Sequence, residues 1–173
     1  DVYKRQLICT MDKLWAPWRM EYIRAKKDKE EGCVFCIKSE EDTDRDNLVL
    51  FRGGSAFVLM NLYPYNNGHI MICPYEHVET TEFLSKDCMT EIMALADQSM
   101  NIFRKSMKAQ GFNFGANIGV AGGAGIADHI HFHIVPRWVG DTNFMPVIGQ
   151  TKVMVDGLLD TYDILKTEFN KLK

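Results

Sequence analysis

The 173-residue chain has a formal net charge of −3, with 46% hydrophobic and 25% charged residues, a balance typical of one soluble globular domain. Its pI near 6.0 argues against non-specific binding to a nucleic-acid polymer, which needs clustered positive charge, but is compatible with a local site for a small anion. No apolar run approaches the roughly 18 residues of a membrane span, and the N-terminus lacks a signal peptide's apolar core. We therefore expect a cytoplasmic protein that does not bind membranes.

The N-terminal boundary is drawn at Met11. Residues 1–10 contain no initiating methionine, and a more protein-like segment begins at Met11. We interpret residues 1–10 as an extension or a sequence-assembly artefact and residues 11–173 as a single domain.

The first half of the chain predicts three strands. Short β-prone runs at residues 48–52 and 55–61 flank Gly53 and Gly54, the signature of a tight hairpin. A turn at residues 66–68 then leads into a third strand, residues 69–73, which Pro74 ends.

The second half predicts two helices and two further strands. Ser85 can cap a long helix from about residue 86 to 110, with Gly111 as its stop signal. A strand at about residues 112–118 leads through a glycine-rich loop to a strand that carries three histidines. The tail, about residues 156–173, reads as an amphipathic helix. The apolar stripes of the two helices are Ile92, Leu95, Ala96, Ser99, Phe103 and Met107, and Leu158, Leu159, Tyr162, Leu165 and Phe169. The predicted fold is α+β, with an antiparallel sheet of about five strands, one long helix and a C-terminal helix.

Three histidines, His129, His131 and His133, stand on alternate positions. On a β-strand their imidazoles would share one face, roughly 6.5–7 Å apart, while the alternating apolar residues enter the core. Glycine-rich residues 119–125 lie just upstream, and small residues let backbone amides approach an anion closely. Histidines beside an amide-rich loop indicate phosphate chemistry.

The histidine row has two chemical interpretations besides structural coincidence. The imidazoles could ligate a transition metal, or one neutral ring could attack phosphorus while its neighbours bind phosphate oxygens. An imidazole with a reference pKa of about 6.5 is largely neutral at pH 7, which suits a labile phosphoramidate intermediate.

The five cysteines are odd in number and irregularly spaced, which favours reduced thiols over a disulfide framework: Cys9, Cys33, Cys36, Cys73 and Cys88. The Cys33-x-x-Cys36 spacing fits a tetrahedral zinc knuckle or a redox pair. A zinc site needs two more ligands, and the alternative is two buried cysteines with a surface His77.

Residues 129–135 resemble the motif of the histidine triad superfamily of nucleotidyl hydrolases and transferases. Residues 61–64 and 67–72 resemble its upstream segment, and residues 15–20 and 135–144 resemble its diadenosine-polyphosphate phosphorylase and hydrolase branch. The resemblance covers most of residues 14–145 and implies that family's fold, with a homodimer whose sheets join edge to edge.

The resemblance implies roles by position. His131 matches the nucleophile that attacks the α-phosphate, and His133 and His69 match residues that line the phosphate site. Several relatives carry a Gln and a Ser or Thr where this chain has Gly125 and Ile126, so backbone amides would have to replace those side chains. The expected substrate-binding residues are Asn61 at the ribose and Asn117, Gly123, Gly125 and Asn143 near the phosphates.

His77 resembles a zinc histidine of the galactose-1-phosphate uridylyltransferase branch, in which the first triad histidine is the fourth ligand. By this resemblance, Cys33, Cys36, His77 and His129 are expected to hold a structural zinc ion that pins the N-terminal segment to the catalytic strand. No organic cofactor is expected.

The expected function is cleavage of a nucleoside polyphosphate, with diadenosine tetraphosphate as the favoured substrate, through a covalent nucleotidyl-His131 intermediate. Water as acceptor gives a hydrolase and inorganic phosphate a phosphorylase, and residues 136–144 favour the phosphorylase branch. Tyr63, Tyr65 and Phe57 could stack on the base or belong to the core. The rival interpretations are a metal-dependent hydrolase or dioxygenase with its metal on the histidine row, and a non-catalytic nucleotide-binding module.

Overall fold

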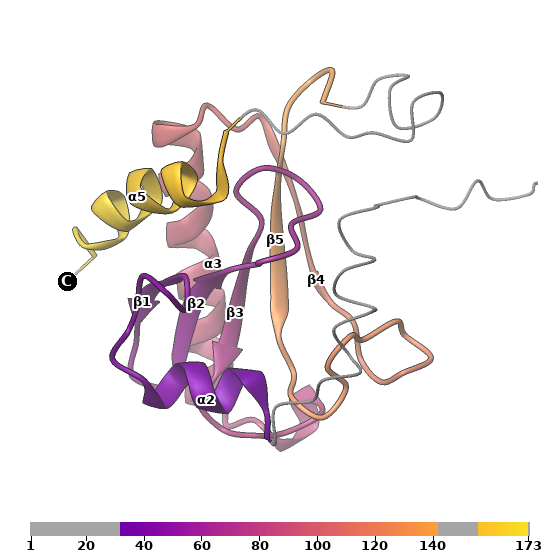
Figure 1. The fold of residues 1–173 in the computed structure, drawn as a ribbon. Coiled ribbons are helices and arrows are strands. Elements are labelled where there is room, and N and C mark those ends of the chain that lie inside the picture. Colours follow the sequence, from indigo (N-terminus) through magenta and orange to yellow (C-terminus); the bar gives the residue numbers. More distant parts are fainter. Residues whose placement is uncertain (1–31, 142–155, 173) are drawn as a thin grey trace, which may run out of the picture.

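The computed structural model describes residues 32–141 and 156–172, which form an antiparallel sheet with helices on both faces (Figure 1). The sheet has five strands in the order β1-β2-β3-β5-β4. The elements are α2 (Val34–Glu40), β1 (Val49–Arg52), β2 (Ala56–Met60), β3 (Ile70–Pro74), the 3-10 helix η2 (Thr81–Phe83), α3 (Lys86–Ser106), β4 (Gly111–Ala116), β5 (Phe132–Arg137) and α5 (Leu158–Phe169). The predicted α+β fold is confirmed. The predictions for residues 1–10, residues 15–20 and Asn143 lie outside the described residues.

Helix α3 lies behind the sheet in Figure 1 and covers that face, and its predicted cap is confirmed. The Ser85 hydroxyl accepts the backbone N–H of Cys88 at 3.1 Å, which satisfies one of the donors left open at a helix start. Every third or fourth α3 residue faces the sheet, so the predicted stripe from Ile92 to Phe103 is buried. The core therefore lies between α3 and the apolar side of the strands.

Helix α3 ends at Ser106, four residues before the predicted end. Lys108 adopts φ +55°. The N–H of the next residue, Ala109, then donates to the carbonyl of Phe103 at 3.2 Å. This closure ends the helix without a glycine, so Gly111 begins β4 instead. In α5, Leu159 is 51% exposed and does not belong to the buried stripe, whereas Tyr162, Leu165 and Phe169 do.

The histidine segment departs from the predicted strand. Its apolar residues enter the core as expected, but β5 begins only at Phe132. Before that point the backbone pairs elsewhere, since the N–H of Ile130 bonds to the carbonyl of Val78 beyond the end of β3. The three imidazoles are therefore not one row. The rings of His131 and His133 lie 4.9 Å apart, whereas the ring of His129 lies 5.1 Å from that of His77.

The second face of the sheet carries a smaller apolar cluster under α2, formed by Phe35, Val49, Phe57, Leu59, Met71 and Cys73. Helix α5 lies against α3 and the edge strand β1. There the Tyr162 hydroxyl donates to the carbonyl of Val49, and the Lys166 ammonium donates to the carbonyls of Val49 and Leu50. Within the described residues, no helix is long and apolar enough to cross a membrane.

Candidate active site and metal centre

His131 presents one ring nitrogen to a cavity of about 150 Å³ on the α2 side of the sheet. Its Nδ1 lies 2.9 Å from the carbonyl oxygen of His129. Because a carbonyl only accepts, Nδ1 carries the proton and Nε2 keeps its lone pair. Among the described residues no buried side-chain nitrogen or oxygen lacks a hydrogen-bond partner, so the unbonded Nε2 is reached by solvent. The arrangement offers a nucleophile to the cavity.

Burial favours the neutral form of this imidazole. The residue is only 5% exposed, and desolvation lowers the pKa of His131 below its ordinary 6.5, against the opposing effect of the bond to the His129 carbonyl. Nε2 is therefore unprotonated at neutral pH, as a nucleophile requires.

The rings of His133 and His69 contact each other, and the backbone sets the direction of the hydrogen bond between them. The backbone N–H of Tyr65 donates to Nδ1 of His69 at 3.0 Å, so in the neutral ring the proton sits on Nε2. That Nε2 lies 2.9 Å from Nδ1 of His133, which must accept. The remaining ring proton of His133 is then on Nε2, and His133 lines the cavity beside His131. His69 is fully buried and does not line the cavity, so its ring contacts that of His133 and not the cavity itself.

The cavity brings together most of the predicted substrate residues. Asn61, Asn117 and Gly125 line it with His131 and His133, and so do Tyr63 and Tyr65, whereas Phe57 is buried and stacks on Tyr75. Asn61 also accepts the N–H of Tyr63 at 2.9 Å, which fixes its side chain. Gly123 is not brought to the cavity. Its N–H donates to the carbonyl of Val120 within an exposed turn.

Helix α2 supplies a wall of the cavity that the sequence interpretation missed. Val34, Phe35 and Lys38 line it. The available signal was the apolar pair between Cys33 and Cys36, since two hydrophobic residues inside a metal knuckle need a surface to pack against. Phe35 finds that surface on the sheet and is 2% exposed.

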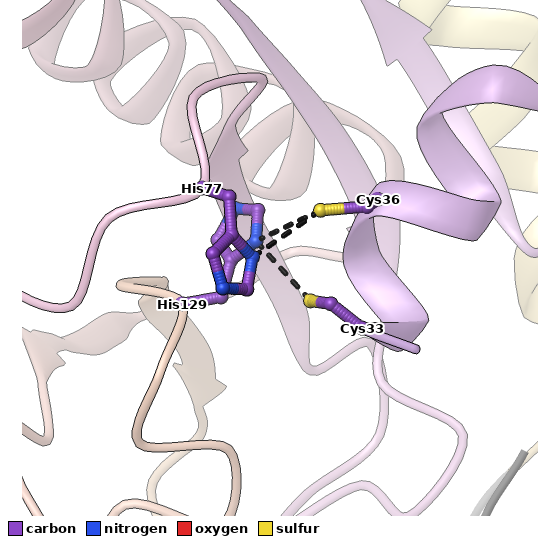
Figure 2. A group of neighbouring side chains, drawn as sticks. All are labelled: Cys33, Cys36, His77 and His129. Carbon is purple, nitrogen blue, oxygen red and sulfur yellow. Dashed lines mark hydrogen bonds between the residues drawn. The ribbon is translucent and has the colours of Figure 1, made fainter. Parts of the chain in front are cut away.

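The four predicted metal ligands converge (Figure 2). Cys33 and Cys36 project from the start of α2 toward the rings of His77 and His129, and the four donor atoms lie within 4.8 Å of one another. The Sγ–Nδ1 distances are 3.3 Å from Cys33 to His129, 3.3 Å from Cys36 to His77 and 3.7 Å from Cys36 to His129. Zinc bond lengths of about 2.3 Å to sulfur and 2.05 Å to nitrogen place tetrahedral S and N ligands about 3.5 Å apart. The donor set fits such an ion.

The protonation states also fit a cation. Nε2 of His129 lies 3.0 Å from the carbonyl of Pro74, which fixes the proton there and leaves the Nδ1 lone pair for a metal. Burial lowers the pKa of His129, so its ring is a neutral ligand, whereas burial and then the neighbouring Cys33 raise the pKa of Cys36. A divalent cation would offset the charge of two adjacent thiolates. Within the described residues, these four side chains form the group that could hold a metal ion. His131 and His133 do not belong to it, so the three triad histidines do not share one metal position.

Comparison with known proteins agrees with this geometry. The family model described as HIT domain matches residues 42–139. The AP-4-A phosphorylase of Mycobacterium tuberculosis is 36% identical over 165 residues, which cover 92% of this chain and 85% of that protein. The bis(5'-adenosyl)-triphosphatase of Dictyostelium discoideum is 28% identical over 54% of this chain and 62% of its own. The crystal structure of a Zn-bound histidine triad family protein from Mycobacterium smegmatis has a TM-score of 0.65 at 20% identity, over 82% of this chain and 95% of that one.

Proposed function

This chain belongs to the histidine triad (HIT) domain family, and from that premise we propose that it cleaves nucleoside polyphosphates, with diadenosine tetraphosphate as substrate, by nucleotidyl transfer through His131. The observation that carries the proposal is the fixed tautomer of His131. Its Nδ1 proton is held by the His129 carbonyl, and its Nε2 lone pair faces the cavity.

The reaction proceeds in two displacements at the α-phosphorus. Nε2 of His131 forms a P–N bond, and the bond from phosphorus to the bridging oxygen breaks, so ATP leaves with that electron pair. The positive charge that develops on the ring is stabilised by the His129 carbonyl, which accepts the Nδ1 proton's hydrogen bond. An acceptor oxygen then attacks phosphorus, and the P–N electron pair returns to Nε2. Phosphate as acceptor yields ADP, and water yields AMP.

The neighbouring groups bind and orient the nucleotide. His133 donates its Nε2 proton to the non-bridging oxygens that gain charge in each transition state, and His69 holds the ring in that orientation. Asn61 binds the ribose, Asn117 and the amide of Gly125 face the phosphates, and Tyr63 and Tyr65 flank the base. Asn143, from the sequence interpretation, is a further phosphate contact in this proposal. Gly123 could contribute only if its turn opened, because its amide is engaged.

Cys33, Cys36, His77 and His129 are proposed to hold zinc. The ion would neutralise the two thiolates and cross-link α2 to the segment before β5, with no role in bond cleavage. We further propose a single domain over residues 11–173, a cytoplasmic location, and a homodimer that covers the outer edge of β4, the last strand of the described sheet.

Product analysis tests the activity and identifies the acceptor. Phosphorolysis of diadenosine tetraphosphate gives ADP plus ATP and requires added phosphate, whereas asymmetric hydrolysis gives AMP plus ATP without it. The similarity to a named phosphorylase at 36% identity favours phosphorolysis. Labelled substrate should leave an acid-labile adduct on the wild type and none on His131→Ala. Full turnover by His131→Ala would refute the nucleophile, and AMP binding without any turnover by the wild type would favour a non-catalytic module.

A further inference from the structure

We infer that metal binding at the Cys33/Cys36/His77/His129 centre and nucleotide binding in the cavity are energetically linked, and that Phe35 is the positioning residue that links them. The inference rests on the proposed function only in taking the cavity as the nucleotide site. It concerns how the two sites affect each other's affinity, which the similarity to relatives does not address.

Helix α2 depends on tertiary contacts at both ends. A seven-residue helix is not stable alone, since a nucleus of fixed residues precedes any gain from further hydrogen bonds. At its C-terminal end the Arg52 guanidinium donates to the carbonyls of Lys38, Ser39 and Glu41. At its N-terminal end the cap residue Cys33 accepts no helix N–H through its side chain. Within the described residues, the side chains of this first turn make their polar contacts through Cys33 and Cys36, with the two histidines.

Phe35 connects that first turn to the nucleophile. Its ring centroid lies 4.8 Å from that of His131 and 5.3 Å from that of His129. It also lines the cavity and belongs to the apolar cluster on this face of the sheet. Because Phe35 stands between two proposed metal ligands in sequence, an ion that fixes both cysteines also fixes the ring that packs on His131 (Figure 2 shows the two cysteines on this turn).

A second connection runs through the backbone. His129 offers its ring nitrogen to the metal centre and its carbonyl to Nδ1 of His131. Ordering His129 on a metal ion therefore orders the acceptor that sets the His131 tautomer. A metal ion thus stabilises one cavity wall and the orientation of the reactive ring together.

Thermodynamic linkage makes the effect reciprocal. If zinc raises the affinity for AMP by some factor, AMP raises the affinity for zinc by the same factor. Coupling between sites is typically about 5- to 150-fold, and the direct contact of Phe35 with His131 leads us to expect roughly tenfold. AMP serves as the probe because it occupies the nucleotide cavity without undergoing transfer.

The experiment measures zinc release, which needs no turnover. Zinc-loaded full-length protein is challenged with a chromogenic chelator with and without saturating AMP, and AMP affinity is measured by calorimetry on loaded and metal-free protein. AMP should slow zinc release, and zinc should tighten AMP binding by a matching factor. Phe35→Leu keeps an apolar side chain and all four metal ligands but loses the ring contact, so it should bind zinc with a coupling factor near one. Phe57→Leu is the matched control, because Phe57 lies in the same cluster but contacts neither the cavity nor a histidine.

The outcomes separate the two proposals. Failure to bind zinc, or equal AMP affinity with and without zinc, would overturn the linkage while leaving the activity intact. Undiminished coupling in Phe35→Leu would overturn the role of Phe35. If Phe35→Leu does not fold, the zinc-release rates of the wild type with and without AMP still test the linkage. If zinc-loaded wild type does not bind AMP, the proposed function fails, and the linkage fails with it.

Discussion

Thr161→Val should destabilise the protein because it removes the hydrogen bond that ties α5 to the turn before His69. The Thr161 hydroxyl is fully buried and donates to Oδ1 of Asn67 at 3.1 Å. Asn67 precedes Gly68, whose φ of +72° makes the sharp turn into His69. Valine has nearly the shape of threonine, so the substitution removes the donor without opening a large cavity.

The expected magnitude follows from burial. Leaving a buried acceptor without its donor lowers the protein's free energy of unfolding by about 1–3 kcal/mol. The acceptor residue here, Asn67, is only 8% exposed. For a chain of this size that loss lowers Tm by about 2–4 °C for each kcal/mol. Because the freed side chain belongs to the turn that orients His69, we also expect kcat to fall with little change in KM.

Denaturant unfolding and steady-state kinetics of three variants check this reasoning. Thr167→Val is the matched control on the same helix, because Thr167 is exposed and its hydroxyl bonds only to the α5 carbonyl of Asp163. It should change stability by less than about 0.5 kcal/mol. Thr161→Ser retains a donor and should recover most of the lost kcat. Equal destabilisation by Thr161→Val and Thr167→Val, or an unchanged kcat in Thr161→Val, would contradict the role given to this bond.

Three further predictions concern the catalytic pair, the metal centre and an ion-pair network. His133→Asn should lower kcat about 100- to 1,000-fold through loss of one oriented donor, with AMP affinity by calorimetry little changed, and a fall below tenfold would argue against that donor. Cys36→Ser should abolish stoichiometric zinc by metal analysis, whereas Cys88→Ser, at the start of α3, should leave it unchanged; equal zinc content in both would place the ion elsewhere. Asp44 is partly desolvated, but Lys166 and Arg52 outweigh this and hold its pKa below the ordinary 3.8. Since the folded-state pKa is the lower one, its stabilising contribution is present above pH 3.8 and is lost as the pH falls below it. Unfolding should therefore show wild type more stable than Asp44→Asn at pH 7 with the difference shrinking below pH 3.8, and a pH-independent difference would exclude this charge effect.

Side-chain chemistry and periodicity were enough to predict the parts of the site that depend on local pattern. The first three strands follow from short β-prone runs between turn residues, and α3 follows from Ser85 and its apolar stripe. The metal group needed the family resemblance, because a lone Cys-x-x-Cys does not name its partners. Helix α2 escaped prediction since its stability comes from Arg52 and the sheet rather than from helix propensity.

The late start of β5, at Phe132, was equally hidden from the sequence. Alternation at residues 129–133 predicts one strand, but the pairing of Ile130 with Val78 is a contact between segments 52 residues apart, which no local pattern records. His129 accordingly belongs to the cluster with Cys33, Cys36 and His77, whereas His131 lines the cavity, although a regular strand would place both on one face. The early end of α3 has a local cause that the residue type does not signal, because Lys108 takes a conformation usually adopted by glycine.

The close spacing of the triad histidines fits the separate contacts that His129 and His131 make. In the proposed site, His129 offers a ring nitrogen to the metal ion and its backbone carbonyl to Nδ1 of His131, two residues further along the chain. The segments that complete both tasks, α2 with its cysteines and α5 with Thr161, lie outside residues 42–139, where the family model matches. The flanking helices therefore contact the histidine segments: Phe35 of α2 packs on His131, and Thr161 of α5 bonds to Asn67, two residues before His69.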